Sequence, residues 1–125
     1  MPVAYTPYKN GTLLIPSGPS SHLFVILTEV DANEEHLLAS ITSVPTVGYY
    51  DATCILTAED HSFLNHDSYV LYRKCEIQRA TRISRLVERK FYIPRDDMPE
   101  EITNRILEGV NESDFTPNFC KNFLN

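Results

Sequence analysis

Short apolar runs separated by turn-forming residues fill the first 77 positions of the chain. The runs fall at residues 12–15, 22–28, 36–44, 53–56 and 68–77. Pro16 and Pro45 end two of them, as expected where a strand stops. The connections are too short to hold the crossover helices that parallel strands require. The pattern therefore predicts a mainly β fold in which five antiparallel strands form a small barrel or curled sheet.

The spacing of apolar residues becomes helical after about residue 80. Ile83, Leu86 and Val87 recur on one side of a helix and predict a short basic helix. A second helix is expected after Asp97, which can cap it, because Glu100 follows three residues later as the partner in a capping box.

Two further signals mark the ends of the predicted helices. Gly109 lies near the end of the second helix, where a left-handed cap is favoured, and Thr116-Pro117 is typical of the cap and first residue of a last helical turn. With 125 residues, the chain fits a single domain, residues 1–125. We expect a barrel at about residues 11–77 and a helical C-terminal part at about residues 80–124.

The composition is ordinary for a folded globular protein, with 42% hydrophobic and 22% charged residues. No apolar run is long enough to cross a bilayer, and the N-terminus lacks the basic and apolar segments of a signal peptide. We therefore expect a cytoplasmic protein without a membrane partner. Cys54, Cys75 and Cys120 are widely spaced and odd in number, so reduced, mostly buried thiols are expected.

The net charge of −6 is unevenly spread, and seven of the eleven Lys and Arg residues lie between Arg73 and Lys90. The basic segment could contact an RNA backbone, while tyrosines just before it could stack on bases. The residues predicted to bind RNA are Tyr69, Tyr72, Arg73, Lys74, Arg79 and Arg82. The alternative is a solvated helix face that pairs with the acidic C-terminal helix.

The loop at residues 59–68 holds the densest set of reactive side chains. His61 and His66 each have an aspartate beside them, Asp60 and Asp67, and a carboxylate bonded to imidazole raises its basicity and fixes its tautomer. The two histidines could share acid and base catalysis, or they could tie the loop by hydrogen bonds to the backbone. A metal site is not predicted, because the only further ligands are His22, His36 or Asp51.

A second group of polar residues falls at strand ends. His22 follows the turn at residues 17–21 and begins the second strand, and Thr42 and Ser43 end the third. Hydroxyl groups at such a position can hold a phosphate or close off the sheet edge.

The strand segments 11–15, 23–27 and 37–43, with the Pro/Ser/Gly loop between the first two, resemble the opening of the PemK/MazF-like toxins. Asp60-His61-Ser62-Phe63-Leu64 and the segment His66-Asp67-Ser68-Tyr69-Val70 look like part of a divergent branch of that family. The resemblance covers about residues 11–77. It implies a small SH3-like barrel, cleavage of RNA without metal, a protein antitoxin as partner, and a homodimer.

The sequence departs from the family pattern at one position. Family ribonucleases use an arginine near the start of the second strand and a threonine or serine at the end of the third. Thr42 can fill the second role, but His22 stands where the arginine is expected. Imidazole can act as acid or base, yet it cannot grip a phosphate as a bidentate guanidinium does.

Two hypotheses follow from the sequence. The first is a toxin-type endoribonuclease that cleaves single-stranded RNA without a cofactor. His22 or His61 would remove the proton of a ribose 2'-hydroxyl and His66 would protonate the leaving oxygen, while Thr42 and Ser43 hold the charge of the phosphate. The second is a non-catalytic barrel module that binds a protein partner or nucleic acid.

Overall fold

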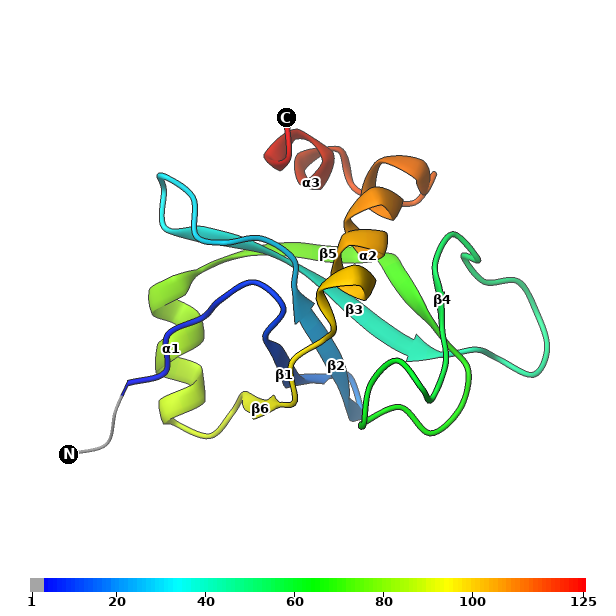
Figure 1. Ribbon diagram of the computed structural model, residues 1–125, viewed down its shortest axis with the longest axis horizontal. Coiled ribbons are helices and arrows are strands. Elements are labelled where there is room, and N and C mark those ends of the chain that lie inside the picture. The colour runs from blue at the N-terminus through cyan, green and yellow to red at the C-terminus, as the bar shows by residue number, and fades with distance from the viewer. Residues whose placement is uncertain (1–3) are drawn as a thin grey trace.

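The computed structural model describes residues 4–125, in which six antiparallel strands form one curled, half-barrel sheet (Figure 1). The strands are β1 (Thr12–Ser17), β2 (Ser20–Ile26), β3 (Glu35–Ser43), β4 (Ile55–Leu56), β5 (Ser68–Arg79) and β6 (Ile93–Arg95). Their order in the sheet is β4-β5-β3-β2-β1-β6. The mainly β, antiparallel fold with helices following the strands is therefore confirmed.

The strand β6 was not predicted from the sequence. It pairs with β1 between Leu14 and Ile93 and between Thr12 and Arg95, and all three of its residues are exposed. Three residues are too few to show a period of two, and a proline within a short run disfavours a strand. Proline is nevertheless tolerated here because β6 is an edge strand, where one side of the backbone needs no partner.

The pairing of β3 with β5 contains an irregularity. Leu38 lies opposite Glu76, whereas Ser40 lies opposite Leu71. One residue of β3 therefore faces four residues of β5, residues 72–75. Such a bulge locally breaks the alternation of side chains along a strand.

The described part of the chain has three helices, all after β5: α1 (Ala80–Glu88), α2 (Glu100–Glu112) and α3 (Asn118–Phe123). The predicted caps are wrong. Pro99 and Pro117 occupy the N-cap positions of α2 and α3, and neither helix has a side-chain cap. Asp97 instead accepts a hydrogen bond of 2.5 Å from the hydroxyl of Tyr8. None of these helices is both long and apolar enough to span a membrane.

Gly109 does not end α2, as the sequence predicted, but lies inside it. Its φ is not positive, so a left-handed cap does not explain the glycine. A Cβ atom at this position would lie 1.9 Å from the hydroxyl oxygen of Tyr72 and 2.6 Å from its Cζ. Tyr72 is fully buried and donates a hydrogen bond of 2.8 Å to the carbonyl of Ile106. Gly109 is therefore required by packing against this ring.

The sheet has a hydrophobic core on each face. The first core lies under α2, which crosses the sheet in Figure 1, and includes Leu23, Val25, Leu27, Leu37, Ala39, Ile41, Val70, Tyr72, Ile102, Ile106, Val110 and Cys120. The second core lies on the other face and includes Ile83 of α1. Its members are Leu13, Ile15, Phe24, Ile26, Leu38, Ile83 and Tyr92. Covering both faces explains why the predicted strands are so rich in apolar residues.

The two cores place the basic α1 and the acidic α2 against different faces of the sheet. Between residues 4 and 125 the one ion pair joins Arg105 and Asp60, at 3.8 Å. The predicted alternative, in which the basic segment pairs with the acidic C-terminal helix, is therefore wrong. The cations of residues 73–90 remain available to a ligand.

The three cysteines are free and buried, as the sequence predicted. Burial raises the pKa of the Cys54 and Cys75 thiols and raises that of Cys120 to about 11. Cysteine reacts as the thiolate, and the raised pKa values leave little thiolate at pH 8. We expect the native chain to show no fast reaction with Ellman's reagent at pH 8, and all three thiols to react in denaturant. A thiol that reacts rapidly in the native chain would contradict this burial.

Candidate functional site

A cavity of about 350 Å³ lies where β2 begins and β3 ends. It brings together four of the five residues that the sequence predicted to be catalytic: His22, Thr42, Ser43 and His66. We call it the histidine cavity. The remainder of its lining comprises Ser20, Ser21, Leu23, Ile41, Phe63, Leu64, Asn65 and Ser68. His61 does not line it.

The strand pairing explains why these residues meet. Leu23 pairs with Ile41, so the first residues of β2 adjoin the last residues of β3. Ser43 pairs with Ser68, and the loop at residues 57–67 leads directly into Ser68. Two strand ends and one loop therefore converge at the same end of the sheet.

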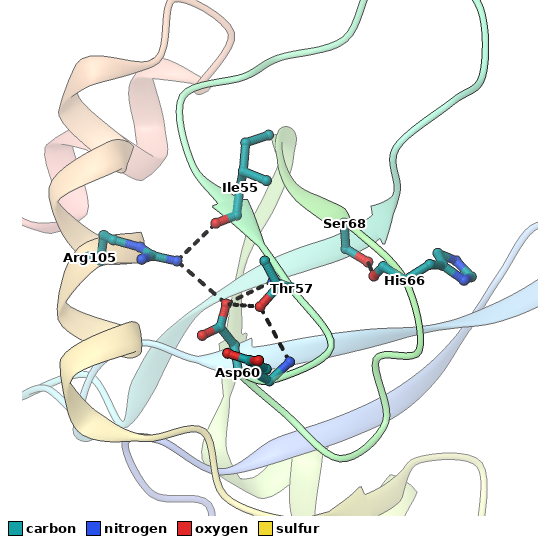
Figure 2. Close-up of polar contacts among 7 residues, drawn as sticks. Ile55, Thr57, Asp60, His66, Ser68 and Arg105 are labelled. Atoms are coloured by element: carbon teal, nitrogen blue, oxygen red, sulfur yellow. Dashed lines mark hydrogen bonds and ion pairs between the residues drawn. The ribbon is translucent and has the colours of Figure 1, made fainter.

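His66 makes the closest polar contact in the histidine cavity. Its Nε2 shares a hydrogen bond of 2.5 Å with the hydroxyl of Ser43. The backbone carbonyl of His66 accepts a hydrogen bond of 3.2 Å from the Ser68 hydroxyl, which fixes the chain at the base of the side chain (Figure 2). The imidazole is exposed, so it can exchange a proton with a ligand or with water.

His22 is half-buried, and its Nδ1 has no hydrogen-bond partner among residues 4–125 although the atom itself is buried. Buried polar atoms normally have a partner, so Nδ1 is an unsatisfied polar atom in the wall of the histidine cavity. Because side chains alternate along a strand, Thr42 projects from the opposite face of the sheet to Ser43. The histidine cavity therefore lies across the end of the sheet rather than on one face.

His61 has a structural role, which corrects its predicted role in catalysis. It is only 5% exposed. Its Nδ1 accepts a hydrogen bond of 3.0 Å from the backbone N–H of Phe63, and its Nε2 lies 2.6 Å from the carbonyl of Asp96. Nε2 must therefore carry the proton and donate it to that carbonyl. With both nitrogens engaged, His61 ties its loop to the chain before α2.

The two aspartates do not support the histidines as predicted. In the described part of the chain, no aspartate carboxylate is hydrogen-bonded to a histidine ring, and the hydrogen bond between His61 and Asp96 is to the backbone carbonyl of that aspartate. The carboxylate of Asp60 accepts a hydrogen bond of 2.8 Å from the backbone N–H of Thr57 and pairs with Arg105 (Figure 2). Arg105 also donates a hydrogen bond of 2.9 Å to the carbonyl of Ile55. Asp60 therefore joins the loop to α2.

The residues predicted to bind RNA divide between two hollows and the core. Tyr69 and Arg73 line one hollow of about 480 Å³, the aromatic hollow, together with Tyr49, Tyr50, Asp51, Leu71, Tyr72 and Phe115. Lys74, Arg79 and Arg82 line another of about 550 Å³, the basic hollow. Tyr72 is fully buried, so its predicted stacking on a base is wrong; it forms part of the wall beneath the aromatic hollow.

The aromatic hollow contains residues that the sequence analysis did not single out. The ring of Tyr50 lies 5.1 Å from that of Tyr69, at an angle of 45°, and Phe115 is exposed at the mouth. The segment around Tyr50 lies between the predicted strands at residues 36–44 and 53–56. The adjacent Tyr49 and Tyr50 are the signal in the sequence that could have pointed to this hollow, since exposed aromatic patches often mark interaction sites.

Within residues 4–125, no three His, Cys, Asp or Glu side chains are grouped so that they could hold a metal ion. His36, considered as a ligand from the sequence, is fully buried, and its Nδ1 donates a hydrogen bond of 2.9 Å to the carbonyl of Thr28. Its imidazole therefore serves the fold.

Comparisons with models of protein families, with curated proteins and with solved structures give no match.

Proposed function

We propose that the chain is a metal-independent endoribonuclease of toxin type, with its active site in the histidine cavity. The observation that carries the proposal is the meeting of His66, His22 and the hydroxyls of β3 in one cavity. In the wall of this cavity, the hydroxyl of Ser43 is hydrogen-bonded to the imidazole of His66. The curled antiparallel sheet is also the kind of fold that the resemblance to the PemK/MazF-like toxins implies.

In the proposed reaction, His22 removes the proton from a ribose 2'-hydroxyl, and the oxygen attacks the adjacent phosphorus. The bond from phosphorus to the 5'-oxygen breaks, and His66 gives a proton to that oxygen. The products are a 2',3'-cyclic phosphate and a 5'-hydroxyl. In-line displacement needs the base and the acid on opposite sides of the phosphorus, and a cavity across the end of the sheet allows an approach from both sides.

The hydroxyls of Thr42 and Ser43 would hold the phosphate oxygens as negative charge develops on them. Ser43 also contacts His66, so it orients the imidazole before RNA binds. The reaction uses no cofactor.

The test is cleavage of a single-stranded RNA by purified protein in excess chelator. We expect cleavage, and we expect His66→Ala to reduce its rate about 10²- to 10⁴-fold, the usual contribution of an acid or base. His22→Ala should have a similar effect. Asp67→Ala is the matched control, since Asp67 is exposed and adjacent to His66, and it should retain activity.

Two outcomes oppose the proposal. Chelator-treated wild-type protein that leaves RNA intact would rule out the enzyme, and full activity of His66→Ala would remove this cavity as the site. Folding of each variant is checked by thermal melting, so that loss of activity is not confused with loss of structure.

One observation favours the second candidate, a binding module without catalysis. Among the described residues, no Lys or Arg lines the histidine cavity, although phosphate sites usually hold a cation. This hypothesis predicts binding of a protein partner or nucleic acid, at the aromatic and basic hollows, without strand scission. The same RNA assay separates the candidates, because bound but uncut RNA supports the module. An antitoxin partner and a homodimer belong to the first candidate, as the resemblance to the PemK/MazF-like toxins implies.

A further inference from the structure

The basic hollow lies between the end of β5, the beginning of α1 and the neighbouring strands β1 and β2. Its volume of about 550 Å³ falls in the range of roughly 300–1,000 Å³ usual for ligand pockets. Ile15, Phe24 and Tyr92 line it and are 6%, 5% and 6% exposed, so its floor is apolar. The hollow therefore combines an apolar floor with a charged rim.

Three cations occupy the rim: Lys74, Arg79 and Arg82. All three are exposed, and none forms an ion pair with another described residue. Arg79 ends β5 and Arg82 lies three positions later, in the first turn of α1. Ile83 of this helix is buried in the second core, which fixes α1 and so holds Arg82 at the hollow. The arrangement suits an anion that accepts several charged hydrogen bonds.

Two carboxylates, Glu35 and Glu76, line the same hollow. One oxygen of Glu76 accepts a hydrogen bond of 2.6 Å from the side-chain amide of Gln78. The amide oxygen of Gln78 in turn accepts one of 3.1 Å from the hydroxyl of Tyr92. Gln78 and Tyr92 are buried, so Glu76 is held in place. A fixed carboxylate beside a cationic group suits a ligand with hydroxyls as well as an anion, as in carboxylate recognition of ribose.

We infer that the basic hollow binds a ribonucleotide. The phosphate contacts Lys74, Arg79 and Arg82, the sugar hydroxyls contact the carboxylates, and the base lies over the apolar floor. This site is separate from the histidine cavity, and nothing in the proposed cleavage requires it. The nucleotide can be a free mononucleotide or one unit of an RNA strand, since both present the same phosphate and ribose.

The test is calorimetric binding of adenosine 5'-monophosphate to the full chain. This ligand has no internal phosphodiester, so its binding does not depend on the proposed cleavage. We expect Arg82→Gln to weaken binding about tenfold or more, the loss expected from one charged hydrogen bond. Arg89→Gln is the matched control. Arg89 is an exposed arginine at the other end of α1 and outside the hollow, and its loss should weaken binding less than twofold.

Two further ligands test the assigned contacts. Adenosine, which lacks the phosphate, should bind at least tenfold more weakly than the monophosphate. The 2',3'-dideoxy monophosphate should bind several-fold more weakly than the ribonucleotide, and Glu76→Gln should reduce this difference. A short single-stranded RNA distinguishes the two sources. If it binds with the same dependence on Arg82 while the mononucleotide does not, the site takes a nucleotide within a strand, and the inference holds.

Equal effects of Arg82→Gln and Arg89→Gln on every ligand would show non-specific attraction to a basic helix and would overturn the inference. So would the absence of binding by both the mononucleotide and the RNA. Because Arg82 and Arg89 are both exposed, neither substitution should unfold the chain, which thermal melting verifies.

Discussion

Gly109→Ala is expected to lower the free energy of unfolding by about 2–3 kcal/mol, the cost of overpacking a core. The added methyl would lie 1.9 Å from the hydroxyl oxygen of Tyr72. That ring is fully buried and cannot swing into solvent. Alanine is the better helix former by about 1 kcal/mol, so an isolated helix would show the opposite sign. Urea denaturation measures the effect.

The partner substitution shows whether Tyr72 is the cause. Tyr72→Phe removes the closest atom, so the loss in the double variant should be smaller than the sum of the two single losses. Tyr72→Phe alone should cost about 1 kcal/mol, because its hydrogen bond to the Ile106 carbonyl is lost. Glu108→Ala, at an exposed neighbouring position of α2, should change stability by less than about 0.5 kcal/mol. A Gly109→Ala variant as stable as the wild type would mean that α2 can move away from the ring.

Truncation of the two histidines in the loop at residues 57–67 should lower the free energy of unfolding by very different amounts. His61→Ala is expected to cost about 2–3 kcal/mol, because a buried side chain is removed and the N–H of Phe63 and the carbonyl of Asp96 each lose a hydrogen bond. His66→Ala should cost less than about 0.5 kcal/mol, since its side chain is exposed. Urea denaturation of both variants gives the comparison.

Amide hydrogen exchange shows whether the loss of stability in His61→Ala is local to the Phe63 hydrogen bond or spread over the whole fold. In His61→Ala, exchange of the Phe63 amide hydrogen should accelerate more than exchange in β2 and β3. In His66→Ala it should stay close to the wild-type rate. If His66→Ala were as unstable as His61→Ala, the assignment of one histidine to the fold and the other to the cavity would be wrong.

Hydrophobic periodicity was enough to predict the main strands and the presence of helices. The predicted ends of the helices failed for tertiary reasons. Asp97 has the right spacing for a capping box, but the hydroxyl of Tyr8 engages its carboxylate. Gly109 has the right place for a C-cap, but it serves the packing of Tyr72. A local pattern cannot reveal a partner that is distant in the sequence.

The candidate site was predictable only in part, for the same reason. The sequence placed His61 and His66 in one loop and gave both an aspartate neighbour. It could not show that one ring turns toward the Asp96 carbonyl and the other toward Ser43. Tyr69 and Tyr72 likewise look alike in sequence, yet they differ in burial.

The bulge at residues 72–75 of β5 has a consequence for how such proteins can change. Arg73 and Lys74 are adjacent, yet they serve different hollows. In a regular strand, inserting or deleting one residue reverses the side on which every later side chain emerges. Residues 72–75 have no paired partner in β3, so a single-codon change in length within this bulge would shift which of them face each hollow while leaving the paired parts of β3 and β5 intact. The chemistry of both surfaces can thus be altered by an insertion or deletion as well as by substitution.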